Sequence, residues 1–129
     1  MSANYESSKL LAEYLLFHYG GEEEILPPDR SWPEGMRQAL GFPVRTVGHF
    51  SGNPVERGLD LGCAVGRSTV EMARNCRTVT GIDFSHAFID AAPSLIRQGP
   101  LAYDRCEEAA RVTRLEARIP ADIDVSRVD

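Results

Sequence analysis

A glycine-rich loop is the segment of this sequence whose residue types and spacing most favour chemistry. It reads Asp60-Leu61-Gly62-Cys63-Ala64-Val65-Gly66-Arg67-Ser68, a D-x-G-x-A-x-G pattern. Small residues at alternate positions let the backbone turn sharply and let a ligand approach closely. The first turn of a helix that follows such a loop presents unpaired N–H groups, which suit a carboxylate. We therefore expect the loop to hold a small zwitterionic ligand.

An acidic residue after the next apolar segment extends this hypothesis. Asp83 stands 17 residues after Gly66, about where an α/β cofactor fold has the carboxylate that binds both ribose hydroxyls. An amino-acid-like head at the loop and a ribose at Asp83 together describe S-adenosylmethionine. A nicotinamide-binding half-fold is a weaker alternative, because the glycine spacing differs from the G-x-G-x-x-G that accommodates a pyrophosphate.

Each of these features also has an ordinary structural interpretation. A glycine-rich turn is common in α/β proteins, and Asp83 alone can cap a helix. We interpret Cys63 as a small filler rather than a nucleophile, because no base stands beside it in the sequence. Together, the loop and Asp83 are stronger evidence for a cofactor site than either is alone, because they follow successive strands in the order that a nucleoside cofactor requires.

Two strands and two helices must position the loop and the acid. Residues 58–62 form a short apolar run that ends in glycine, and a periodic apolar segment follows as far as Ala73. Residues 77–82 are rich in β-branched side chains, and Ser85 is a suitable cap for a second helix. Helices between strands require crossovers, so the pattern predicts an α/β fold with a parallel sheet and helices on its faces. Pro93 predicts that the second helix kinks or stops early.

The N-terminal part of the chain, residues 1–53, is predicted to be a helical extension of a unit over residues 54–129. An apolar stripe predicts a helix over residues 4–19, and prolines mark a connector with short helices near residues 34–40 and 43–50. The stripe consists of Leu11, Tyr14, Leu15 and His18.

The segment after Gly99-Pro100 is ambiguous. Residues 101–106 are compatible with a strand, and residues 107–118 with a helix or with the return arm of a hairpin. Periodicity does not separate the two alternatives.

The composition excludes several classes of partner. The chain has 129 residues, 14 Lys and Arg against 19 Asp and Glu, and a formal net charge of -5. Without a basic field, neither nucleic acid nor a membrane surface is expected as a partner. The chain has no apolar run of roughly 20 residues and no signal-like start, so we expect a cytoplasmic protein. Three cysteines and scattered histidines predict neither a disulfide framework nor a metal site.

Several blocks resemble a known family. Residues 59–68 and Gly81-Ile82-Asp83-Phe84-Ser85 are similar to the cofactor half of class I S-adenosylmethionine-dependent methyltransferases. The block Tyr14-Leu15-Leu16-Phe17-His18-Tyr19-Gly20 and the Cys-Ala-Val form of the loop narrow the resemblance to the 4-mercaptohistidine N-methyltransferases of ovothiol biosynthesis. Further blocks lie at residues 5–7, 42–45 and 126–128, so the resemblance covers nearly the whole chain.

The resemblance implies a Rossmann-like fold, S-adenosylmethionine as cofactor and a small histidine-derived thiol as substrate. It also implies an incomplete sheet, since the chain stops at Val128-Asp129, where the fourth strand should begin. From its residues, the first helix is a candidate lid, since Tyr14, His18 and Tyr19 can offer π faces to the sulfonium and hydrogen bonds to a histidine-like acceptor. Plain packing in the core is the alternative for Tyr and Leu side chains at helical spacing. The residues that would contact the cofactor are Asp60, Gly62, Cys63, Ala64, Gly66, Asp83, Phe84 and Ser85.

A second function of another class stays open. A non-catalytic remnant that binds the cofactor, or that docks on another subunit, would fit the incomplete sheet. The reason is that an open parallel edge leaves backbone groups unpaired.

Overall fold

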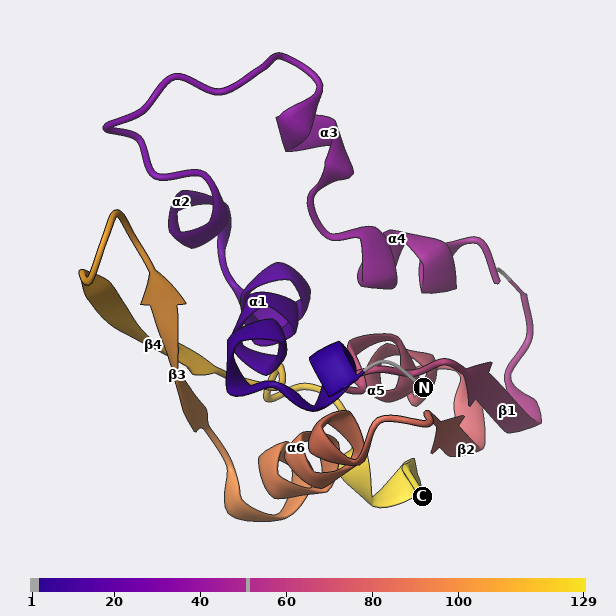
Figure 1. Cartoon of the computed structure of the whole chain (residues 1–129). Helices are drawn as coiled ribbons and strands as arrows, with labels where there is room; N and C mark the ends of the chain where they lie inside the picture. Colours follow the sequence, from indigo (N-terminus) through magenta and orange to yellow (C-terminus); the bar gives the residue numbers. More distant parts are fainter. Residues whose placement is uncertain (1–2, 51) are drawn as a thin grey trace.

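The computed structural model describes residues 3–50 and 52–129, and Figure 1 shows the arrangement of their elements. Helices dominate the first part of the chain, and strands alternate with helices after it. The helical elements are η1 (Ala3–Glu6), α1 (Ser8–Tyr19), α2 (Glu22–Ile25), α3 (Met36–Ala39), α4 (Phe42–Gly48), α5 (Arg67–Met72), α6 (His86–Gln98) and η2 (Val125–Arg127), and the strands are β1 (Val55–Leu61), β2 (Cys76–Ile82), β3 (Leu101–Cys106) and β4 (Val112–Ala117).

Strands β1 and β2 pair in parallel, and α5 is the crossover between them. On the other edge of β2, Val128 pairs in parallel with Val79. The Asp129 N–H donates to the Val79 carbonyl (2.8 Å), and the Gly81 N–H donates to the Asp129 carbonyl (3.1 Å). These parallel segments, joined through helices, are the α/β arrangement that the sequence predicts, and they fit a Rossmann-like fold.

Strands β3 and β4 form a separate antiparallel hairpin, with Tyr103 opposite Leu115. Of the two alternatives for residues 107–118, the return arm is therefore the one observed. Strand β3 pairs in the hairpin and not in the parallel sheet, and the isolated bridge of Val128 lies beside β2. The expectation that a fourth strand begins at Val128-Asp129 stays a prediction. Figure 1 shows the hairpin and the β1–β2 pair on opposite sides of α1.

A buried apolar cluster joins α1 to the rest of the chain. Leu15 of α1, Val65 of the loop, Phe88 of α6 and Tyr103 of the hairpin all belong to it. Contacts from several elements meet at α1, so the helix is a structural member of the fold around the loop.

The opposite face of the β1–β2 pair is open. Helix α5 packs on the face where Val79 is fully buried. Leu59, Leu61 and Ile82 lie on the other face and are 56%, 72% and 51% exposed.

Helix α6 differs from its prediction. It continues through Pro93 to Gln98, so of the two expectations, a kink or an early stop, the early stop is wrong and the kink stays a prediction. Phe88, Ala91 and Leu95 are buried along one side, and this packing outweighs the hydrogen bond that a proline cannot donate. Ser85 caps the helix as predicted, since its Oγ accepts the Phe88 N–H.

The helices before β1 agree closely with their predictions. The helix predicted over residues 4–19 is divided into η1 and α1, because the Ser7 side chain caps α1 by accepting the Leu10 N–H at 3.2 Å. The short helices expected near residues 34–40 and 43–50 are α3 and α4. Among the residues that the structure describes, no helix combines the length and the apolar character that a membrane crossing requires.

The packing of α1 gives a first prediction. Leu15 is 1% exposed, and Leu15→Ala should lower the free energy of unfolding by about 2–5 kcal/mol, because it leaves a cavity between four elements. Leu59→Ala, on the open face, is the matched control and should cost less than about 1 kcal/mol. Urea unfolding measures both values. Equal losses of unfolding free energy in the two variants would mean that Leu15 of α1 is not part of the buried core.

Candidate functional site

The loop after β1 is shaped by its small residues. Gly62, Ala64 and Gly66 have φ angles of 77°, 47° and 81°, in the left-handed region that larger side chains seldom adopt. The N–H groups of Gly62 and Cys63 both donate to the Ile82 carbonyl, at 2.8 and 3.1 Å. The loop therefore bends away immediately beyond β1 while it stays bonded to the end of β2.

Asp83 lies directly against this loop. Its Oδ2 accepts the Ala64 N–H at 2.9 Å, and its Oδ1 accepts the Ser85 N–H at 2.9 Å. The structure thus brings together the bend and the acid that the sequence singled out. The two bonds also fix the orientation of the carboxylate, and its remaining lone pairs stay available to hydroxyl donors.

Asp60 joins the end of β1 to the start of α5. Its Oδ2 accepts hydrogen bonds from Ser68 Oγ (2.7 Å) and Thr69 Oγ1 (2.8 Å). Its Oδ1 accepts none from the residues that the structure describes. One carboxylate oxygen of Asp60 is therefore free for a cationic donor.

The end of α1 is fastened to the loop by Tyr19. Its hydroxyl donates to the Val65 carbonyl at 2.9 Å, and burial raises its pKa. The Arg67 guanidinium carbon lies 5.9 Å from the centre of the Tyr19 ring, and Arg67 also forms an ion pair with Glu71 at 2.8 Å. Sequence reasoning missed Arg67, whose only signal was its position directly after the last glycine of the loop.

His18 is a half-buried imidazole at the same end of α1. Burial and then the charge of Arg67 lower its pKa to about 4, and the charge of Asp60 opposes this shift. Its ring contacts those of Tyr14 and Phe17, with centroids 5.5 and 5.9 Å apart. Its Nδ1 is buried and has no hydrogen-bond partner among the described residues. An unpartnered buried polar atom is costly, so His18 has an unused capacity to bind a polar group.

Aromatic rings gather beside Asp83, where η1 meets α6. The Tyr5 ring lies 5.3 Å from that of Phe84 and 6.3 Å from that of Phe88, and the Tyr14 ring lies 4.5 Å from that of Phe88. Burial raises the pKa of Tyr14, and the charges of Tyr5 and Asp83 raise it further. Phe84 remains 52% exposed, so its ring is accessible.

The segment η1 is held on the first turn of α6. Glu6 accepts the N–H groups of His86 and Ala87, both at 3.0 Å, and Ser85 Oγ donates to the Tyr5 carbonyl at 2.9 Å. A carboxylate is favoured at a helix N-terminus, which explains the position of Glu6. The Ser85 side chain, predicted as a cofactor contact, is fully buried and bonded within the protein.

Cys63 is buried behind the loop. It is 3% exposed, and burial raises the pKa of its thiol to about 11. It lines a cavity of about 160 Å³ between the sheet and α6, together with Gly81 and Ile96, and neither Asp60 nor Asp83 borders this cavity. These features support its interpretation as a filler and not as a nucleophile. No cluster of three or more His, Cys, Asp or Glu side chains in residues 3–50 and 52–129 is arranged to hold a metal ion.

A family model matches the second half of the chain. Residues 59–123 match the family model described as a methyltransferase domain. The matched segment begins in β1 and includes the loop, Asp83, α6 and the β3–β4 hairpin. No curated protein resembles the chain closely enough to count as a match.

The low pKa of His18 predicts a dependence of stability on pH. A pKa of about 4 in the folded chain, against 6.5 ordinarily, means that protonation favours the unfolded state. Stability should therefore fall by about 3 kcal/mol as the pH drops from 6.5 to 4. His18→Phe should lose this component, and urea unfolding at several pH values would measure the difference. The same pH dependence in both chains would contradict the burial of a neutral imidazole.

Proposed function

The chain belongs to the methyltransferase domain family that its residues 59–123 match, and from this premise we propose that it binds S-adenosylmethionine and methylates a small molecule. The observation that carries the proposal is the hydrogen bond from the Ala64 N–H to the Asp83 carboxylate. It holds a glycine-rich bend and an acid at the ends of neighbouring strands. A crevice at such strand ends is where open α/β folds bind nucleoside cofactors.

The residues around the loop fit the amino-acid end of this cofactor. The free Oδ1 of Asp60 is an acceptor for an ammonium group. A Cβ atom added at Gly62 would meet nothing within 4 Å, so a ligand has room to approach the backbone there. We assign the methionine end to Asp60, Gly62, Ala64 and Gly66.

The other end of the cofactor would lie along Asp83. This carboxylate is already oriented by two backbone N–H groups, and its remaining lone pairs suit the two ribose hydroxyls. The half-exposed ring of Phe84 offers a surface for the adenine. When bound, S-adenosylmethionine supplies an electrophilic methyl group on a sulfonium.

The contribution of the chain to catalysis would be positioning. Tyr14, His18 and Tyr19 belong to a helix fastened over the loop, where they can exclude water and hold the acceptor. Alignment of two reactants is worth roughly 7–11 kcal/mol. A neutral imidazole acceptor already has a lone pair, so no general base is required.

The narrower acceptor rests on the resemblance of the sequence blocks. We propose an imidazole nitrogen of 4-mercaptohistidine, which makes the substrate a small histidine-derived thiol. A turnover assay with this compound, against other thiols and amines, tests the narrow assignment. Methylation of the others but not of the imidazole would refute it and leave the methyltransferase activity standing.

A second candidate is a non-catalytic module that binds the cofactor or a partner. The observation that favours it is the open apolar face at Leu59, Leu61 and Ile82, since contiguous exposed apolar residues often mark an interaction surface. Ligand binding without turnover on any acceptor would support this candidate.

Binding of S-adenosylhomocysteine tests the proposed site. Asp83→Asn removes a charged acceptor, so the dissociation constant should rise at least about tenfold. Asp90→Asn, an exposed acid on α6, is the control and should bind as the unsubstituted chain does. Isothermal titration calorimetry measures all three constants. Equal affinity in both variants, or no binding by the unsubstituted chain, would refute the assignment.

A further inference from the structure

Helix α1 lies between two supports, the loop at residues 62–66 and the β3–β4 hairpin (Figure 1). On the loop side, the Tyr19 hydroxyl is bonded to the Val65 carbonyl. On the hairpin side, Leu15 and Tyr103 share one buried cluster. The position of α1 over the loop therefore depends on the position of the hairpin and on that of residues 20–32, the segment that follows α1.

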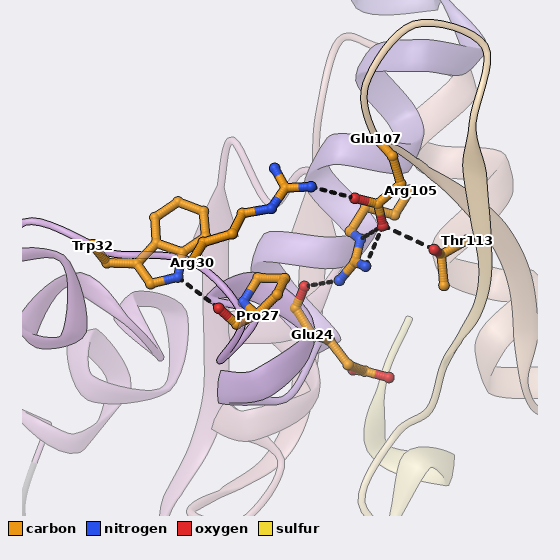
Figure 2. Close-up of polar contacts among 7 residues, drawn as sticks. All are labelled: Glu24, Pro27, Arg30, Trp32, Arg105, Glu107 and Thr113. Atoms are coloured by element: carbon orange, nitrogen blue, oxygen red, sulfur yellow. Dashed lines mark hydrogen bonds and ion pairs between the residues drawn. The ribbon is translucent and has the colours of Figure 1, made fainter.

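A group of polar contacts, which we name the hairpin clamp, joins that segment to the hairpin (Figure 2). Its centre is Glu107, whose Oε1 accepts from Arg105 Nε (2.9 Å), from Arg105 Nη2 and from Thr113 Oγ1 (2.8 Å). The Oε2 of Glu107 accepts from Arg30 Nη2 at 3.0 Å. Arg105 also donates through Nη1 to the Glu24 carbonyl at 2.5 Å. The hairpin clamp consists of Glu24, Arg30, Arg105, Glu107 and Thr113.

The centre of the hairpin clamp is partly shielded from solvent, while Arg30 at its edge is 40% exposed. The side chains of Arg105 and Glu107 are 18% and 15% exposed, whereas those of the Arg114–Asp104 pair on the outer face of the hairpin are 66% and 49% exposed. Hydrogen bonds from Arg105 and then Thr113 hold the pKa of Glu107 below its usual range. Exposed ion pairs contribute little, whereas charge-assisted bonds at shielded positions give stronger and more specific contacts.

Both sides of the hairpin clamp are ordered by their own local bonds. The Glu107 N–H donates to the Arg111 carbonyl at 2.8 Å, which closes the turn between β3 and β4. Trp32 Nε1 donates to the Pro27 carbonyl at 2.9 Å, which closes the loop around Arg30 (Figure 2). The contact therefore joins two preformed turns.

We infer that Arg105 and Glu107 are positioning residues that hold α1 over the loop and thereby set the affinity for the amino-acid end of the ligand. This inference rests on the proposed function. Neither residue is among those assigned to the ligand. Arg105 acts through the Glu24 carbonyl, and Glu107 acts through Arg30. Glu24 belongs to α2, which follows Tyr19 after the turn at Gly20 and Gly21.

Two ligands distinguish a positioning role of Arg105 and Glu107 from a general contribution of these residues to stability. S-adenosylhomocysteine carries the amino-acid end, and 5′-methylthioadenosine lacks it. Glu107→Gln should weaken the binding of S-adenosylhomocysteine about tenfold, because it removes a charged acceptor of four hydrogen bonds, and should leave the binding of 5′-methylthioadenosine unchanged. Thr113→Val removes one of these bonds at nearly the same shape and should show the same selectivity with a smaller effect. Asp104→Asn, at the exposed outer pair, is the control and should change neither affinity.

Hydrogen exchange without ligand gives a second readout. In Glu107→Gln, the backbone amides of residues 16–20 should exchange about tenfold faster, while those of α6 stay unchanged. A lower melting temperature with unchanged exchange and unchanged S-adenosylhomocysteine affinity would overturn the inference and leave only a structural role. Failure of the unsubstituted chain to bind either ligand would instead overturn the proposed function.

Discussion

The hydrogen bond between the Ala64 N–H and the Asp83 carboxylate is the constraint around which this structure is arranged. Ala64 makes this bond from a left-handed conformation, and the glycines on either side of it, Gly62 and Gly66, also have positive φ angles, which small residues adopt most readily. The bond requires β1 and β2 to be parallel neighbours, since only then do the loop and the acid leave the sheet at the same edge. The crossover through α5 supplies that pairing.

The N-terminal segment is bound to this centre at two places. Glu6 accepts two N–H groups at the start of α6, just beyond Asp83, and Tyr19 donates to Val65 within the loop. Between these bonds, α1 presents Tyr14 and His18 among buried neighbours. If the chain binds an activated methyl donor as we propose, these three hydrogen bonds would hold α1 over the loop and over Asp83. Exclusion of water and alignment of the acceptor would then follow from this arrangement.

The sequence predicts the parts of this site whose partners are close along the chain. The small residues of the loop, the β-branched segment of β2 and the cap at Ser85 follow from backbone preferences and hydrogen bonding of single residues. Contacts between distant segments have no such local signal. Glu6 meets α6 about 80 residues later, and Arg105 meets the carbonyl of Glu24. The hairpin at residues 101–117 stayed ambiguous for the same reason, because its register depends on packing against α1.

The most direct test of the account is a titration of the ¹⁵N-labelled chain with S-adenosylhomocysteine, followed by amide chemical shifts. If the loop and Asp83 hold opposite ends of one ligand, the amides of residues 62–66 and 83–85 will shift together with a single dissociation constant. The amides of α3 and α4, which the proposed site does not include, will stay unchanged. Shifts confined to another part of the chain, or two groups of shifts with different dissociation constants, would contradict the account.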